Sequence, residues 1–211
     1  MLDTQVRPLI NRPLDAAGIA IARLGVSANA VSYFGLGVGL AAAFAIAHGH
    51  FKAAFVLIVA NRILDGVDGA VARATAPTDS GGYLDIVVDY VFYASVPLAF
   101  AVFDPALNAL PAAALLAAFC LTCSSFLAFA AIAAKRRIET EAHGRKSFFY
   151  STGIIEGTET VVFFLLITAF PRGFPLLAWI FAGLCVLTAV QRSLLAFKLF
   201  DHETSNPNRS E

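Results

Sequence analysis

Six long apolar stretches dominate the sequence and leave few folds open to the chain. They cover residues 30–48, 52–74, 82–103, 107–134, 153–170 and 174–199. A helix needs about 20 mostly apolar residues to cross a bilayer, and each stretch is near that length. The connections between them are short, so neighbouring helices are expected to be antiparallel. We therefore predict an all-α polytopic membrane protein with six transmembrane helices.

The composition supports this prediction. Of the 211 residues, 58% are hydrophobic and 14% are charged, whereas a soluble domain is roughly 45–50% apolar and about 25% charged. So few charges cannot cover a surface that faces water, which argues against a soluble globular enzyme, a disordered chain or a nucleic-acid-binding domain. The 15 Lys and Arg balance the 15 Asp and Glu, so no net field attracts a polyanion.

The two ends of the chain differ from the apolar stretches. In residues 1–25, apolar side chains alternate irregularly with Arg and Asp, which is typical of an amphipathic helix in the membrane interface. A simple leader segment is the alternative. Residues 200–211 form a polar tail that is expected to fray. The six-helix bundle then covers 30–199, and 1–211 form one integral-membrane domain.

The distribution of Lys and Arg between the connections predicts the orientation. With the N-terminus in the cytoplasm, the outer side receives Lys52 and Arg172. The inner side receives twelve basic residues: Arg7, Arg12, Arg23, Arg73, Lys135, Arg136, Arg137, Arg145, Lys146, Arg192, Lys198 and Arg209. Basic loops stay in the cytoplasm. We expect a protein of a bacterial-type inner membrane with both termini in the cytoplasm.

Four aspartates lie inside the second and third apolar stretches, where ionisable residues are rare and mark function. They are Asp65, Asp68, Asp85 and Asp89. Salt bridges to Arg62 and Arg73 are one explanation. Two arginines cannot neutralise four carboxylates, so a bound cation is the simpler one.

The spacing of the aspartates brings them together. Asp65 and Asp68 are three residues apart and Asp85 and Asp89 four apart, so each pair shares one helix face. In antiparallel helices, Asp68 is expected level with Asp85 and Asp65 level with Asp89, about 5–12 Å below the inner surface. A cluster of carboxylate oxygens suits Mg²⁺ or Mn²⁺, and four carboxylates have room for two ions.

Small residues and one arginine accompany the carboxylates. Gly69 and Arg73 are four residues apart, on the side of the helix that carries the aspartates. An acidic metal site with a guanidinium one turn nearer the water is suited to a diphosphate, because the metal bridges phosphate oxygens and Arg binds them at two points.

These residues resemble the signature of the CDP-alcohol phosphotransferases, also called CDP-alcohol phosphatidyltransferases. The signature is D-x-x-D-G-x-x-A-R, eight residues, then G-x-x-x-D-x-x-x-D. The matching residues are Asp65, Asp68, Gly69, Ala72 and Arg73 in the first half and Gly81, Asp85 and Asp89 in the second. The one departure is a spacer of seven residues between Arg73 and Gly81.

The resemblance implies a reaction and roles for residues. The family displaces CMP from a CDP-linked lipid, usually CDP-diacylglycerol (CDP-DAG), by an alcohol hydroxyl, within the membrane and usually as a homodimer. Asp65, Asp68 and Asp85 would hold the metal, and Asp89 would complete the site and act as the base. The residues expected to contact the CDP-lipid are Asn29, Ser32, Asp65, Gly69, Arg73, Thr78, Ser80 and Gly81. Asn29 and Ser32 fit a family motif that begins with a proline, which is missing here.

The acceptor alcohol is not defined by these motifs. A basic loop containing Arg136 and Arg137 could bind an acceptor phosphate, or could serve only topology and contacts with anionic lipids. Glu156 and Glu159 could bind an amino or quaternary ammonium acceptor, or pair with Arg192.

Two other functions use similar residues. An intramembrane aromatic prenyltransferase also has Asp-rich helices, Mg²⁺ and a diphosphate, but it needs a longer chain and a second, distant Asp motif. A cation transporter would need acidic residues through the depth of the membrane. Here the four aspartates lie within 25 residues at one level.

Overall fold

The protein folds into helices throughout the part that its computed structural model describes, residues 3–135 and 155–204. The helices are α1 (Asp3–Arg23), α2 (Ala28–Ala47), α3 (Phe51–Ala74), α4 (Asp79–Phe103), α5 (Pro105–Lys135), α6 (Gly157–Ala169), the short 3₁₀ helix η2 (Pro171–Gly173) and α7 (Phe174–Thr204). The predicted all-α class is confirmed. Each of the six predicted apolar stretches overlaps one of the helices from α2 to α7, although α6 begins only at Gly157.

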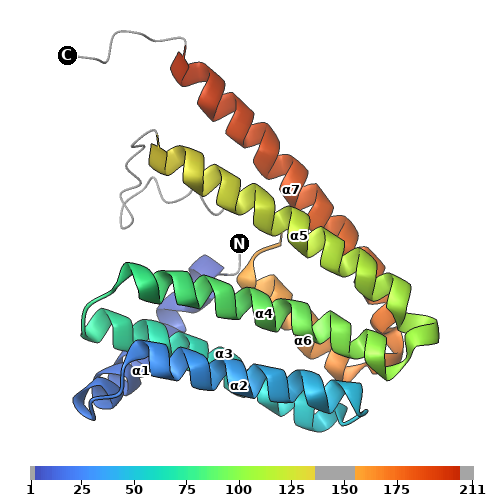
Figure 1. The fold of residues 1–211 in the computed structure, drawn as a ribbon, viewed down its shortest axis with the longest axis horizontal. Coiled ribbons are helices and arrows are strands. Elements are labelled where there is room, and N and C mark those ends of the chain that lie inside the picture. The colour runs from blue at the N-terminus through green and yellow to red at the C-terminus, as the bar shows by residue number, and fades with distance from the viewer. Residues whose placement is uncertain (1–2, 136–154, 205–211) are drawn as a thin grey trace.

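The helices α2, α3, α4 and α6 run side by side, and α5 and α7 form a pair that extends beyond them (Figure 1). The connections α2–α3, α4–α5 and α6–α7 lie at one end of the bundle. The connections α1–α2 and α3–α4 lie at the other end. This alternation is the antiparallel arrangement expected from short connections.

The core of the bundle is rich in aromatic side chains. Phe100 of α4 stacks on Phe174 at the start of α7, with ring centroids 4.3 Å apart. Phe164 of α6 meets Phe92 of α4 edge to face, at 5.7 Å. Large apolar side chains also cover the outside of the bundle, among them Phe34, Phe44, Leu110, Leu176 and Phe197. An apolar exterior of this extent is typical of a protein that contacts lipid.

Within the described residues, four helices are long and apolar enough to cross a membrane. They are α2, α4, α5 and the segment Pro171–Asp201, which joins η2 to most of α7. The helix α3 has the length, with 24 residues, but carries the charged site residues. The helix α6 has 13 residues and is about 20 Å long, shorter than the roughly 30 Å hydrocarbon core. The chain is therefore an integral membrane protein with four clear spans.

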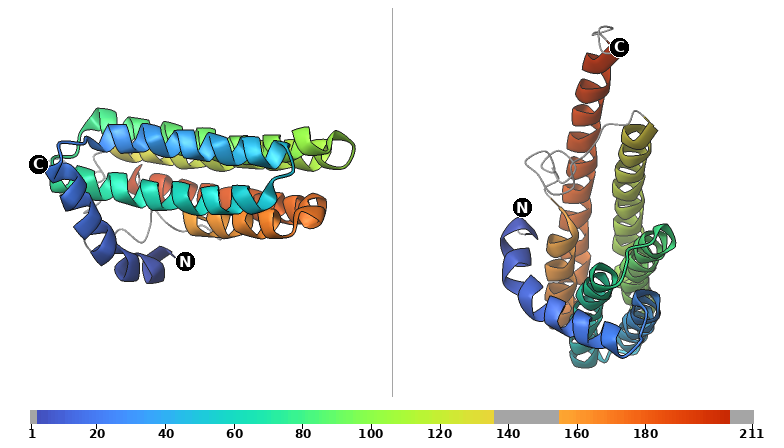
Figure 2. Two further views of the ribbon diagram at one scale, coloured as in Figure 1. Left: turned by 90° about the horizontal axis from the view of Figure 1, so that it is seen from below. Right: turned by 90° about the vertical axis from the view of Figure 1, so that its left-hand side faces the viewer.

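The helix α1 lies across the end of α3 at an angle to the bundle (Figure 2). Gly18 permits the contact, because a Cβ atom added to it would lie 2.6 Å from the Ala70 Cβ atom and 2.7 Å from the Ala70 carbonyl carbon. Leu14 packs against Gly66, one turn along α3. The second half of α1 is therefore packed on the part of α3 that carries the aspartates.

Replacing Gly18 by Ala should destabilise the protein, because the new methyl group meets the backbone of α3. Overpacking of this kind costs about 1–3 kcal/mol. The control is Gly37→Ala in α2, since no neighbouring atom lies within 4 Å of a Cβ atom added there, and Ala favours a helix by about 1 kcal/mol over Gly. The thermal unfolding midpoint in detergent should fall for Gly18→Ala and stay level or rise for Gly37→Ala. Equal midpoints would contradict this account of the α1–α3 contact.

Candidate metal and nucleotide site

Three aspartates form a compact oxygen cluster between α3 and α4. One carboxylate oxygen from each of Asp65, Asp68 and Asp85 lies within 4.8 Å of the others. Asp68 is buried, Asp65 is half-buried and Asp85 is exposed, so the cluster is open on one side. Three convergent carboxylates with one open side are suited to a divalent cation that keeps some water ligands, such as Mg²⁺ or Mn²⁺.

The buried carboxylate is held by a hydroxyl from α2. The Ser32 hydroxyl donates a hydrogen bond of 2.6 Å to the Asp68 Oδ2 atom, and its side chain is also within 3.2 Å of the Ala28 carbonyl. A hydrogen bond to a charged acceptor is short and strong. Ser32 therefore fixes the orientation of Asp68, as groups behind metal-binding residues do.

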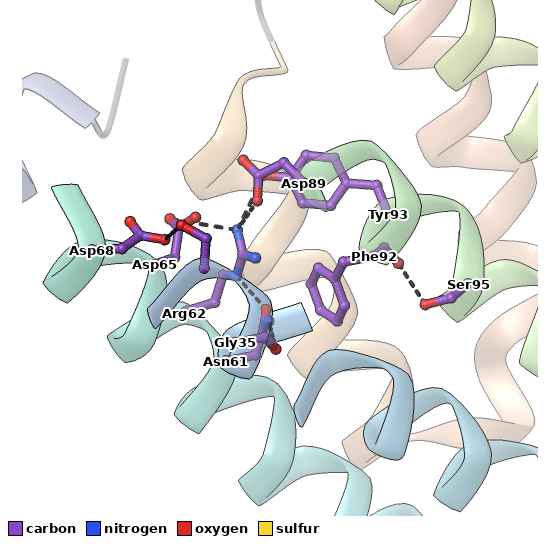
Figure 3. Close-up of polar contacts among 10 residues, drawn as sticks. Gly35, Asn61, Arg62, Asp65, Asp68, Asp89, Phe92, Tyr93 and Ser95 are labelled. Carbon is purple, nitrogen blue, oxygen red and sulfur yellow. Dashed lines mark hydrogen bonds and ion pairs between the residues drawn. The ribbon is translucent and has the colours of Figure 1, made fainter. Parts of the chain in front are cut away.

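Asp89 faces an arginine rather than the cluster of three aspartates. The Arg62 Nη1 atom lies 3.0 Å from the Asp89 Oδ1 atom and 3.7 Å from the Asp65 Oδ2 atom. Figure 3 shows the guanidinium group between the two carboxylates. Asp65 and Asp89 were expected at the same height in the bundle, and both indeed contact Arg62.

Asn61 and Arg62 are functional candidates that the sequence motifs did not single out. The Arg62 Nε atom donates a 2.8 Å hydrogen bond to the Asn61 Oδ1 atom, and Asn61 Nδ2 donates to the Gly35 carbonyl of α2, also at 2.8 Å. The position of Arg62, three residues before Asp65, was a usable signal for an ion pair along α3. The contact of Arg62 with Asp89 could not be predicted in this way, because it depends on the rotation of α4 about its own axis.

Arg73 makes a different contact from the one considered in the sequence. Its Nη2 atom lies 2.8 Å from the Asp15 Oδ1 atom of α1. Its side chain is 56% exposed, and its Nη1 atom is 3.3 Å from the place of a Cβ atom on Gly69. Gly69 and Arg73 therefore do lie side by side. Asp15 belongs to no sequence motif. Its contact with Arg73 could be predicted only by knowing that α1 crosses α3.

Four of the residues expected to contact the CDP-lipid come together at the start of α4. Thr78 caps the helix by accepting a 3.1 Å hydrogen bond from the Gly81 N–H group. The hydroxyls of Thr78 and Ser80 are 3.3 Å apart. A Cβ atom on Gly81 would lie 3.3 Å from the Asn29 Oδ1 atom of α2. These polar groups lie at the same end of the bundle as the α1–α2 connection.

The expected acceptor residues are only partly described. Arg136 and Arg137 lie outside the described residues. Glu156 and Glu159 form a capping box at the start of α6, in which the Glu156 N–H group donates to the Glu159 Oε2 atom at 3.1 Å. Arg192 of α7 donates hydrogen bonds to α5, at 3.0 Å to the Thr122 carbonyl and 3.1 Å to the Ser125 hydroxyl.

Comparison with known proteins defines the class. The model of the CDP-alcohol phosphatidyltransferase family matches residues 25–191, which include both pairs of aspartates. The chain belongs to this family and is a membrane-bound transferase of the corresponding class. The resemblance inferred from the signature is confirmed, and the prenyltransferase and cation-transporter alternatives are set aside.

Similar proteins come from several organisms. The chain is 44% identical over 192 residues to the inner membrane protein YnjF of Escherichia coli K12, covering 91% of this chain and 93% of that protein. It is 31% identical over 94 residues to archaetidylinositol phosphate synthase of Pyrococcus horikoshii, covering 44% and 50% of the two chains. It is 34% identical over 134 residues to phosphatidylcholine synthase of Bradyrhizobium diazoefficiens, covering 61% and 47%.

Solved structures share the fold. Phosphatidylinositol phosphate synthase of Mycobacterium tuberculosis, solved with CDP-DAG bound, matches with a TM-score of 0.71 and 20% identity over 88% of this chain and 94% of that chain. The same enzyme in complex with manganese and citrate matches with a TM-score of 0.69 and 20% identity over 89% of each chain.

Replacing Ser32 by Ala should weaken binding of Mn²⁺ to the cluster, because Asp68 loses the hydroxyl that orients it. Losing such a supporting group typically lowers metal affinity about 10–100-fold. The matched control is Ser95→Ala in α4, whose hydroxyl donates to the Phe92 carbonyl of its own helix. Titration of Mn²⁺ followed by electron paramagnetic resonance measures both affinities. An unchanged affinity in Ser32→Ala would show that the hydroxyl does not support a metal-binding carboxylate.

Proposed function

We propose that the protein transfers the phosphatidyl group of CDP-DAG, or of a related CDP-linked lipid, to the hydroxyl of a small alcohol and releases CMP. The main support is the match of the family model across both aspartate pairs. The oxygen cluster of Asp65, Asp68 and Asp85 agrees with it, since a diphosphate substrate calls for a divalent cation. A structure of the same fold has been solved with CDP-DAG bound.

The metal is proposed to be Mg²⁺ or Mn²⁺, with two ions in the fully loaded site. Asp65, Asp68 and Asp85 would be its main protein ligands, which their spacing of 4.8 Å or less supports. A manganese complex of an enzyme with this fold is consistent with the choice. When bound, such ions supply positive charge that stabilises the diphosphate and makes CMP a better leaving group.

Asp89 is proposed as the general base. In the reaction, the acceptor oxygen forms a bond to the phosphorus that carries the diacylglycerol, the bond from that phosphorus to the CMP oxygen breaks, and Asp89 takes the hydroxyl proton. The ion pair with Arg62 of α3 holds the Asp89 side chain of α4 in one position. This agrees with the proposed role, because a general base must be positioned beside the proton that it takes.

The nucleotide is proposed to lie along the polar ends of α2, α3 and α4. Asn29, Thr78, Ser80 and Gly81 offer amide, hydroxyl and backbone groups there. Arg73 is proposed to bind the diphosphate at two points, which its planar guanidinium group allows. Ser32 would contribute through Asp68.

The acceptor alcohol is proposed to enter from the water side, towards Asp89. Arg136 and Arg137 would suit an acceptor that carries a phosphate. Glu156 and Glu159 would suit an acceptor with an ammonium group, beyond their use in capping α6. The two pairs favour acceptors of opposite charge, so a panel of alcohols distinguishes them.

The topology is proposed to have six spans, with α3 and α6 added to the four clear ones. Both termini and the active site would face the cytoplasm. The α1–α2 and α3–α4 connections lie at one end of the bundle, which agrees with the charge distribution (Figure 1). A homodimer surrounded by membrane lipids is proposed on the basis of the family resemblance. The mass of the protein in mild detergent tests this oligomeric state.

Release of CMP tests the function. Purified protein with CDP-DAG, Mg²⁺ or Mn²⁺ and a panel of alcohols should release CMP with at least one acceptor. Asp89→Asn keeps the size of the side chain but cannot take the proton, so turnover should fall about 10²–10⁴-fold while CDP-lipid still binds. The control is Asp104→Asn at the far end of α4, which should keep full turnover. Near-native turnover in Asp89→Asn would refute the base assignment.

Cysteine labelling tests the orientation. In intact cells, a membrane-impermeant maleimide should label Asp104→Cys, in the α4–α5 connection, and should not label Ala76→Cys, in the α3–α4 connection. Inverted membrane vesicles should reverse the result. The unmodified chain gives the background from Cys120, Cys123 and Cys185. Labelling of Asp104→Cys from the cytoplasmic side alone would rule out the proposed topology.

A further inference from the structure

Arg62 places a fixed positive charge inside the carboxylate site. Its side chain is 15% exposed, and its Nη1 atom lies 3.0 Å from Asp89 and 3.7 Å from Asp65. It is thus the guanidinium group of α3 that lies among the site carboxylates, whereas Arg73, on the same helix, contacts Asp15.

The guanidinium group is held by several contacts besides those with the carboxylates. Its Nε atom donates to Asn61, which is 3% exposed and itself donates to the Gly35 carbonyl. Its central carbon lies 4.7 Å from the centroid of the Phe92 ring and 5.5 Å from that of the Tyr93 ring. Its Nη1 atom also reaches the Tyr93 hydroxyl, at 3.4 Å. Displacing Arg62 would leave the buried Asn61 amide without this partner, which is unfavourable.

The charges of the site residues limit the number of divalent ions that the site can bind. Four carboxylates and one guanidinium group leave an excess of three negative charges, so one divalent ion is accommodated and a second makes the site positive. The second ion would also need Asp89, whose Oδ1 atom faces Arg62. A divalent ion beside a guanidinium group is strongly repelled in a partly buried site.

We propose that Arg62 is a positioning residue that keeps Asp89 apart from the three-aspartate cluster and limits the substrate-free site to one divalent ion. The negative charge of a substrate diphosphate would then be needed before a second ion binds. This inference rests on the proposed function for the role it gives to Asp89. The ion count that follows from it does not require any turnover.

Counting bound Mn²⁺ in the purified wild-type protein, without nucleotide or CDP-lipid, tests the proposal directly. Electron paramagnetic resonance should show one tightly bound ion per chain, at the three-aspartate cluster. Two ions of similar affinity in the wild-type protein would overturn the proposal. This measurement needs no variant, so it stands even where a substitution prevents folding.

Arg62→Met removes the charge and keeps most of the side-chain volume. With Asp89 released, the variant should bind a second Mn²⁺ ion, with an affinity within about tenfold of the first. The control is Arg172→Met in η2, which removes a guanidinium group at the opposite end of the bundle and should leave the count at one. Arg62→Lys, which keeps the charge, should also bind one ion. A count of one in Arg62→Met would overturn the proposal.

The outcomes separate this inference from the proposed function. The ion count involves only the protein and Mn²⁺, whereas the function is tested by CMP release from CDP-DAG. One ion in the wild type and two in Arg62→Met, with no CMP released under any condition, would support the charge role of Arg62 and refute the reaction.

Discussion

The need to place carboxylates within a helical bundle in a membrane governs the rest of this structure. Asp65, Asp68 and Asp85 bring like charges within 4.8 Å, an arrangement that is unfavourable in a medium of low dielectric unless cations and hydrogen-bond donors compensate it. The protein supplies Ser32 from α2 and Arg62 from α3. A divalent cation could balance the remaining negative charge, since the oxygens of Asp65, Asp68 and Asp85 lie close enough together to hold one.

Close packing lets the donors reach the acids. The α2 helix approaches α3 and α4 at Gly39, where an added Cβ atom would lie 2.7 Å from the Phe92 ring and 3.0 Å from the Asn61 amide nitrogen. That closeness allows Asn61 to bond to the Gly35 carbonyl and so to hold Arg62. Packing between α2 and α3 thus helps to hold the guanidinium group, which in turn contacts Asp89 of α4.

The sequence was sufficient to predict the helices and the meeting of most of the acids. Periodic spacing places Asp65 and Asp68 on one face of α3, and short connections bring α4 alongside. The ion pair of Asp89 with Arg62 was not predictable, because it depends on the rotation of α4 about its own axis. The contact of Arg73 with Asp15 required the crossing angle of α1. The length of α6 was also missed, since the apolar stretch from residue 153 does not reveal where the capping box begins.

The short α6 helix has a consequence for how deep the reaction occurs. It starts with two glutamates in its capping box, and a Cβ atom on Gly157 would lie 3.8 Å from the Tyr93 hydroxyl, which in turn contacts Arg62. Polar groups of α6 therefore share a level with the carboxylates of α3 and α4. Acyl chains pack poorly against charged groups, so we expect water and lipid headgroups to reach this level of the bundle. In the proposed function, an acceptor alcohol arriving from the water would meet the lipid-linked substrate at this level.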